Sequence, residues 1–434
     1  MNESNVGAFI AKAASGSFVI KILGAGISFI MHVLLARWMG VEQYGVYIYA
    51  LTWVGLLGLF ARHGRNTALV KLVAQYRAQK EWGLAKGAIK NSSLSVLFVS
   101  LAIGMISYLF VPLFLDLSEQ QLHTFWLALL LLPVVSLTQL RRSTIQAFKR
   151  VVQAQLPDVV VRPLLLMGVA GAVYLISDEK LSAPLVMAVN VVAALCAFIL
   201  GGYLLYRLIP QEMKAAVAKF QNREWMMLAL PMLFIAGMNM VLRQTDIVMI
   251  GPFMGSESVG IYSAVSRVTE LVAFGLMSVN SIVAPMISEY YHTDRKAELQ
   301  HMITLASWGI FATTLILALG LIFFGEWILA LFGEGFSQGF SALLVLLIGQ
   351  LINALAGSVG FLMIMTGHQT QQAKILAVSA IVNITLNAIL IPRFGLIGAA
   401  SATACATVLW NLSMLYYVVR YIGLNPTILA RVKK

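Results

Sequence analysis

Long runs of apolar residues constrain the fold of this chain more than any other feature. A helix needs about 20 mostly apolar residues to cross the hydrocarbon core of a bilayer. Hydrophobic residues make up 60% of the chain and charged residues 11%, whereas soluble domains have roughly 45–50% and about 25%. The sequence therefore predicts an all-α integral membrane protein that crosses the bilayer about 12 times. The expected spans are 14–35, 45–61, 92–114, 122–140, 158–177, 183–206, 226–250, 258–286, 303–324, 339–365, 375–392 and 397–420.

Basic residues gather on one side of these spans. With the N-terminus inside, the cytoplasmic segments carry 23 of the 30 Lys and Arg residues, whereas the opposite connections carry only Arg37, Lys180 and Arg393. The positive-inside rule then places both termini in the cytoplasm. The same asymmetry explains the net charge of +12, so we expect the lipid bilayer and no nucleic acid as a partner.

Two short segments of the chain resemble each other. Residues 39–47 read Met-Gly-Val-Glu-Gln-Tyr-Gly-Val-Tyr, and residues 254–262 read Met-Gly-Ser-Glu-Ser-Val-Gly-Ile-Tyr. One such glycine turn between spans would be uninformative, but two copies half a chain apart indicate a duplication. Six spans in each copy give parallel repeats. We expect an N-terminal six-helix lobe (1–206), a basic cytoplasmic linker (207–224) and a C-terminal six-helix lobe (225–434).

The basic stretch 62–90 follows the second span. We predict that it forms a cytoplasmic interfacial helix among anionic headgroups. An alternative is that Arg62 and Arg65, at the cytoplasmic mouth of that span, form an entrance that guides an anionic substrate into a cavity.

Motifs of common enzyme and metal sites are absent from the sequence. No HExxH, CxxC, Walker-type glycine loop or GxSxG occurs. His32 and His63 have no second ligand at metal spacing, so packing or gating is the simpler explanation for both. We therefore expect a transporter with no catalytic residue, no bound metal and no cofactor.

Ionisable residues inside the apolar spans are the strongest functional signal, because charge in a membrane is costly and usually functional. Arg162 lies close enough to the cytoplasmic end of its span to snorkel. Arg243–Asp246 and Arg267–Glu270 form i, i+3 pairs that either neutralise each other within a helix or belong to a cationic chamber that recognises an anion. In the second case the carboxylates tune the chamber or carry a coupling cation, Na⁺ or H⁺. The residues in question are Lys21, Arg162, Arg243, Asp246, Arg267 and Glu270.

For Lys21, which has no local acidic partner, we favour the chamber. Arginine suits phosphate because its planar fork offers paired donors. A chamber with several cations and few acids would suit a phosphate-bearing lipid headgroup, whereas a cationic drug would prefer the reverse.

Two segments of the sequence resemble a known family. Residues 35–47 read Leu-Ala-Arg-Trp-Met-Gly-Val-Glu-Gln-Tyr-Gly-Val-Tyr and resemble the signature of Wzx-type polysaccharide and oligosaccharide-lipid flippases. Thr366-Gly-His together with residues 383–403 is similar to the wider multidrug/oligosaccharidyl-lipid/polysaccharide (MOP) superfamily, which also holds MATE drug exporters and MurJ-type lipid II flippases.

This resemblance implies a MATE-like fold of two six-helix lobes around a cavity that alternates between inward-open and outward-open states. The implied cargo is a polyprenyl-diphosphate-linked oligosaccharide, such as an O-antigen or capsule repeat unit, moved from the cytoplasmic to the outer leaflet. Lys21, Arg243 and Arg267 would bind the substrate, with Asp246 and Glu270 in coupling or tuning.

The expected location is the bacterial cytoplasmic (inner) membrane, and a polysaccharide polymerase and chain-length machinery are candidate partners. One alternative is a MATE-like, cation-coupled exporter of small organic molecules. A remote alternative is a membrane-embedded glycan polymerase or ligase, which the short outer connections disfavour.

Overall fold

The computed structural model describes residues 3–114, 117–177 and 179–428, and nearly all of them are helical. Two compact units are formed, Met1–Gly237 (unit 1) and Met238–Lys434 (unit 2), and each is considered by itself below. Within the described residues, ten helices are long and apolar enough to cross a membrane.

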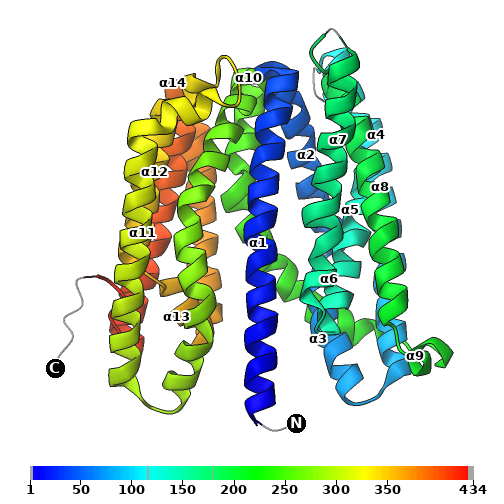
Figure 1. Cartoon of the computed structure of the whole chain (residues 1–434), viewed down its shortest axis with the longest axis vertical. Helices are drawn as coiled ribbons and strands as arrows, with labels where there is room; N and C mark the ends of the chain where they lie inside the picture. Colours follow the sequence, from blue (N-terminus) through cyan, green and yellow to red (C-terminus); the bar gives the residue numbers. More distant parts are fainter. Residues whose placement is uncertain (1–2, 115–116, 178, 429–434) are drawn as a thin grey trace. The chain divides into compact units, whose positions relative to one another are not determined.

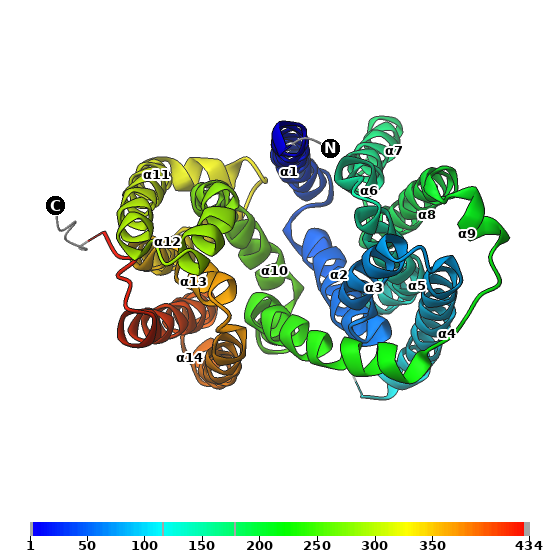
Figure 2. The same ribbon diagram turned by 90° about the horizontal axis from the view of Figure 1, so that it is seen from below.

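Unit 1 contains six membrane-length segments and two short helices (Figures 1 and 2). A π-helical segment, η1, interrupts the fifth of them between α6 and α7. The elements are α1 (Glu3–Met39), α2 (Val41–Arg62), α3 (Arg65–Ala78), α4 (Trp82–Phe114), α5 (Glu119–Ala147), α6 (Val151–Leu156), η1 (Pro157–Val161), α7 (Arg162–Ile176), α8 (Ala183–Leu208) and α9 (Gln211–Ala215).

Helix α5 lies at the centre of unit 1. It packs against α2, α3, α4 and α8, and Figure 2 shows it enclosed by these neighbours. Leu131, Leu132, Leu140 and Ile145 of α5 are fully buried. Helices α4 and α8, by contrast, carry exposed apolar side chains such as Phe98 and Ile199.

Unit 2 contains fewer helices because two of them are very long. Helix α10 begins in unit 1 and continues into unit 2. Gly255 in α10 and Gly395 in α14 have non-helical backbone angles, so each of these helices supplies two spans. The elements are α10 (Asn222–His292), α11 (Lys296–Ala330), η2 (Phe336–Gly339), α12 (Phe340–Ala356), α13 (Val359–Met365), α14 (Gln369–Tyr417) and η3 (Val418–Ile422).

The two glycine breaks reconcile ten helices with the 12 predicted spans, and the predicted fold class is confirmed. Gly40, between α1 and α2, has φ 79° and ψ 169°, and Gly255 has φ 81° and ψ 177°. Residues with a side chain rarely adopt this positive φ. The same backbone turn at matching positions is what a duplicated helix pair predicts. The lobe limits and the cytoplasmic placement of both termini stay predictions.

Three predicted boundaries were wrong. Residues 62–90 are not one helix, because α3 ends at Ala78 and Lys80 has a φ of 59° before α4 begins. The span expected over 339–365 is broken at Gly357, whose φ is 71°. Helix α5 continues to Ala147, well beyond the predicted end of its span.

Candidate functional site

A buried carboxylate, Asp246, lies in unit 2 on the segment of α10 that precedes Gly255. The turn at Gly255 folds the two segments of α10 back on each other and brings Tyr262 to Asp246. The turn at Gly395 does the same for α14 and brings Thr403 beside Asn387 and Asn383. We call Asp246, Tyr262, Asn383, Asn387 and Thr403 the Asp246 cluster.

Three side chains donate hydrogen bonds to Asp246. Tyr262 Oη and Thr403 Oγ1 each donate to Oδ2 at 2.6 Å, and Asn387 Nδ2 donates to Oδ1 at 2.9 Å. Asn383 Nδ2 donates to Thr403 Oγ1 at 3.3 Å. Asp246 is 5% exposed, and Asn383 and Asn387 are fully buried.

The Asp246 cluster has an excess of acceptors. No Lys or Arg of the described part of the chain forms an ion pair with Asp246. The Oδ1 atoms of Asn383 and Asn387 are buried without a hydrogen-bond partner. A buried charge that lacks a counter-charge is costly, because low-dielectric surroundings do not replace its hydration. The arrangement therefore suits a proton or a small monovalent cation.

The predicted alternative in which Arg243 neutralises Asp246 was wrong. Arg243 is exposed, whereas Asp246 turns into unit 2 toward Tyr262 and Thr403. Arg267 does pair with Glu270, with Nη1 and Oε2 separated by 3.4 Å, and both side chains are partly exposed. Such an exposed i, i+3 pair is worth little stability. Lys21 of α1 is exposed.

A second charged cluster lies in unit 1, where Arg141 of α5 meets η1 and α8. Arg141 Nη2 donates to Asp158 Oδ2 at 2.8 Å, and Nη1 donates to the carbonyl oxygens of Ala197 and Phe198, both at 3.0 Å. Both charged side chains are largely buried, so the pair fixes α5 to η1.

Arg162 extends this polar region. Its Nε and Nη2 donate to Asn190 Oδ1 at 3.1 and 2.9 Å, and Asn190 Nδ2 donates to Tyr47 Oη at 3.0 Å. The prediction that Arg162 snorkels to the cytoplasmic end was therefore wrong, because it binds α8 instead. Sequence reasoning missed three of these residues. Arg141 lies just past the predicted end of its span, and Asp158 and Asn190, inside predicted spans, were not singled out.

The predicted cytoplasmic entrance residues differ in their surroundings. Arg65 is 6% exposed and donates to Asn91 Oδ1, which ties α3 to α4. Burial lowers the pKa of Arg65. Arg62 is partly exposed at the end of α2. A joint role in admitting substrate stays a prediction.

Within the described ranges, no three His, Cys, Asp or Glu side chains gather in a way that could hold a metal ion. The Asp246 cluster instead offers one carboxylate, two side-chain amides and two hydroxyl groups.

Comparison with known proteins gives the family context. The family described as "Polysaccharide biosynthesis protein" matches residues 10–291, and the MatE family matches residues 231–389. The chain is 20% identical over 427 residues to the probable low-salt glycan biosynthesis flippase Agl15 of Haloferax volcanii, covering 96% of this chain and 85% of that protein. It is 24% identical over 206 residues to the capsular polysaccharide biosynthesis protein CapF of Staphylococcus aureus, covering 47% and 51%.

Solved structures show the same fold. An inward-facing MATE multidrug transporter of the MOP superfamily superposes with a TM-score of 0.77 at 11% identity, covering 94% of this chain and 98% of that one. The lipid II flippase MurJ in an inward closed conformation gives 0.74 at 16% identity, covering 94% and 87%. Since the first family matches well over half of the chain, this protein belongs to the polysaccharide biosynthesis protein family.

Proposed function

We propose that this protein moves a polyprenyl-diphosphate-linked oligosaccharide from the cytoplasmic to the outer leaflet by alternating access. The cargo would be an O-antigen, capsule or exopolysaccharide repeat unit. The observation that carries this proposal is basic charge in membrane helices without an acidic partner. Lys21 and Arg243 are exposed, and neither forms an ion pair among the described side chains.

Lys21, Arg243 and Arg267 bind the diphosphate in this proposal. Cations in a low-dielectric setting attract a multiply charged anion strongly, and guanidinium groups add paired hydrogen bonds. Glu270 lowers the net charge near Arg267, to which it is bound. The polyprenyl tail stays in lipid, so the chain has to accommodate only the headgroup and the sugars.

The Asp246 cluster supplies the coupling step of the proposal. A proton or Na⁺ bound at Asp246 would neutralise the carboxylate, and the amide oxygens of Asn383 and Asn387 would complete its surroundings. Because Asp246, Tyr262 and Thr403 come from three different helical segments, loading or emptying the site changes the attraction between those segments. The gradient of the ion then biases the conformational equilibrium.

Charge reversal tests the substrate assignment. Lys21→Glu, Arg243→Glu and Arg267→Glu should each abolish delivery of the glycan to the outer surface while the protein still inserts. Arg223→Glu is the matched control, because Arg223 is an exposed arginine near the start of α10. Undiminished delivery in all three variants would contradict the assignment.

A MATE-like exporter of small organic molecules is the second candidate. It is favoured by the MatE match to residues 231–389, which contain Asp246, Asn383 and Asn387. Drug resistance gained on expression and lost in Asp246→Asn, with no glycan delivery, would support this candidate over the first.

A further inference from the structure

The segment of the chain that follows η3 lies against α11 in unit 2. The backbone turns at Gly423, whose φ is 78°, and we call residues 424–427 the strap. Asn425 N donates to Gln300 Oε1 at 2.8 Å, and Gln300 Nε2 donates to the Asn425 carbonyl oxygen at 2.7 Å. Ser307 Oγ donates to the carbonyl oxygen of Pro426. The strap is therefore bound at two positions of α11 that are about two helical turns apart.

The strap also enters the break between α12 and α13. Gly357, at this break, has φ 71° and ψ −147°. A Cβ at Gly357 would lie 2.3 Å from the Pro426 carbonyl oxygen and 2.6 Å from Ser307 Oγ. At the next residue, Ser358 Oγ donates to Asn280 Oδ1 of α10, and both side chains are buried. A glycine at position 357 leaves room for the strap, so the break and the strap fit each other.

Helix α13 is a seven-residue segment between two glycine turns. Gly367, which follows its end, has φ 85°, so the backbone at both ends of α13 adopts a conformation that residues with a side chain rarely adopt. Leu362 and Met363 of α13 are buried in the same apolar cluster as Leu424 of the strap. The strap therefore holds α13 at its start and along its apolar face. A short segment between two such turns can rotate as a unit when it is released, as elements flanked by hinges do.

Unit 1 contains a counterpart of the strap. Leu208-Ile209-Pro210 stands at the end of its sixth membrane segment, and Leu424-Asn425-Pro426 follows the sixth membrane segment of unit 2. Lys86, the fifth residue of α4, donates from Nζ to two carbonyl oxygens of the segment that follows, at 2.6 and 2.8 Å. Gln300 is likewise the fifth residue of α11. Both units thus bind the segment after the sixth span to the start of the third.

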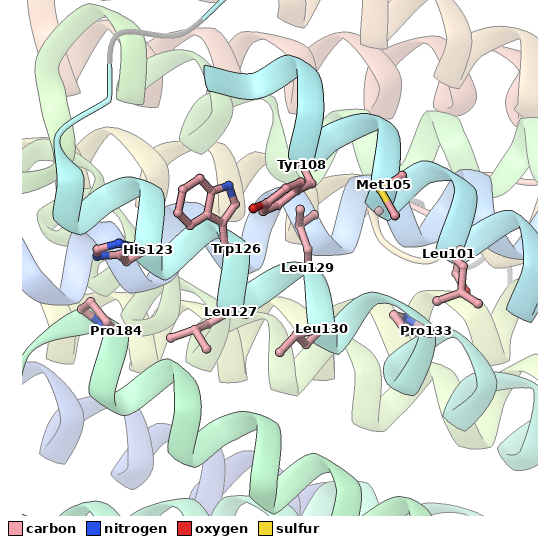
Figure 3. Close-up of a pocket in the computed structure, with 12 residues that line it drawn as sticks. Leu101, Met105, Tyr108, His123, Trp126, Leu127, Leu129, Leu130, Pro133 and Pro184 are labelled. Atoms are coloured by element: carbon pink, nitrogen blue, oxygen red, sulfur yellow. The ribbon is translucent and has the colours of Figure 1, made fainter. Parts of the chain in front are cut away.

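The two units differ in their fourth membrane segment. In unit 1 this segment is α5, which is one helix from Glu119 to Ala147. Figure 3, a view of the apolar pocket between α4 and α5, shows α5 continuous from His123 to Pro133. In unit 2 the fourth segment is broken at Gly357, and the strap fills the break. Because unit 1 binds its third span without such a break, the break in unit 2 has a role beyond holding the fold together.

We propose that the strap is a latch for α13. With the strap in the break, α13 is held against α14 and η3. When the strap leaves, α13 turns about Gly357 and Gly367 and opens that end of unit 2, which the distribution of basic residues predicts to be cytoplasmic. The latch opens in each transport cycle, whatever the cargo, so this inference goes beyond the proposed function and does not depend on the substrate.

Hydrogen exchange of the full chain in nanodiscs tests the latch without any cargo. A helix of seven residues is too short to keep its amides protected alone. The amides of α13 should therefore exchange together with Asn425 N–H, because one opening exposes both, whereas the amides of α12 should exchange more slowly. Exchange of α12 and α13 at one common rate would overturn the proposal, since it would show that the two helices move as one body.

Gln300→Ala/Ser307→Ala removes the side chains that hold the strap and leaves α13 itself unchanged. Exchange of the α13 amides should become about tenfold faster. Thr313→Ala is the matched control, because the Thr313 hydroxyl of α11 bonds only within its own helix. Equal rates of α13 exchange in the double variant and in the control would also overturn the proposal.

A reversible cross-link distinguishes a latch from a fixed support. Cys196 and Cys405 are exposed and are first replaced by serine. Gln300→Cys/Asn425→Cys is then joined by a reducible bifunctional thiol reagent, which should stop transfer of a labelled polyprenyl-diphosphate oligosaccharide in vesicles until the link is reduced.

Lys86→Cys/Lys214→Cys is the matched control for the cross-link, because it joins the counterpart of the strap in unit 1 and should leave transfer unchanged. Transfer unaffected by the link in unit 2 would refute the latch and leave the proposed function intact. If the reduced chain transfers no glycan, the proposed function fails, and the exchange measurement then decides the latch by itself.

Discussion

Gly201 of α8 makes room for the buried Arg141–Asp158 pair, and Gly201→Ala should break it. A Cβ at position 201 would lie 2.1 Å from Arg141 Cζ and 2.2 Å from Nη1. Both distances are far below van der Waals contact, so the Arg141 side chain or α8 must shift. We expect the guanidinium group, at the end of a side chain, to shift and to leave the carbonyl oxygens of Ala197 and Phe198, to which it donates at 3.0 Å.

The expected cost follows from two opposing terms. Disrupting a buried ion pair costs about 3–5 kcal/mol, whereas alanine in place of glycine in a helix contributes about 1 kcal/mol. The free energy of unfolding should therefore fall by about 2–4 kcal/mol. For a unit of this size, each kcal/mol shifts Tm by about 2–4 °C. We expect a Tm lower by about 5–15 °C.

Gly202→Ala is the control for this measurement. An added Cβ at Gly202 meets nothing within 4 Å, so only the favourable helix term remains. Thermal unfolding in one detergent should separate the two variants clearly. In an Arg141→Met/Asp158→Leu background, Gly201→Ala should lose most of its effect. Equal Tm values for Gly201→Ala and Gly202→Ala in the wild-type background would refute the reasoning.

Three further predictions concern the Asp246 cluster and the corner between α2 and α3. Thr403→Val removes a hydrogen-bond donor to Asp246 and should lower the free energy of unfolding by about 1.5–3 kcal/mol. The control Thr385→Val loses only a hydrogen bond within its own helix and should cost less, so an equal loss of Tm in the two variants would contradict this prediction. Asp246→Asn should abolish stimulation of transport by a Na⁺ or proton gradient, measured in vesicles, and retained stimulation would exclude Asp246 as the coupling group. Burial, with a further contribution from the charge of Arg65, lowers the pKa of His63, so the unfolded chain binds the proton more tightly. The stability that this lowered pKa contributes is present above the unfolded pKa of about 6.5 and is lost as the pH falls below it. Between about pH 7 and pH 5, the Tm of the wild type should therefore fall more than that of His63→Gln. Parallel curves of Tm against pH for the two proteins would contradict a lowered pKa of His63.

Much of the fold could be predicted because the bilayer imposes a simple length rule. Runs of about 20 apolar residues have few alternatives to membrane helices, and the matching turns at Gly40 and Gly255 were readable as a repeat. Helix boundaries were harder. Basic residues at 141 and 142 suggested the end of a span, but α5 continues to Ala147 because Asp158 and the α8 carbonyl oxygens satisfy Arg141.

The candidate site was predicted only in part. Asp246 was identifiable as a charge in an apolar run, but its partners Asn387 and Thr403 lie 141 and 157 residues further along the chain. Only the tertiary fold brings them together, and single Asn and Thr residues in spans usually pack between helices. Local spacing therefore suggested Arg243 as the partner of Asp246. In the structure, three neutral side chains donate hydrogen bonds to Asp246 instead.

Transfer by the purified chain is the most direct test of the proposed function. Vesicles that contain the protein and a labelled polyprenyl-diphosphate oligosaccharide would be exposed to a membrane-impermeant glycosidase. The account predicts that inner-leaflet glycan becomes accessible with the wild-type chain and stays protected with Arg243→Glu. Protection with the wild-type chain equal to that in protein-free vesicles would contradict it.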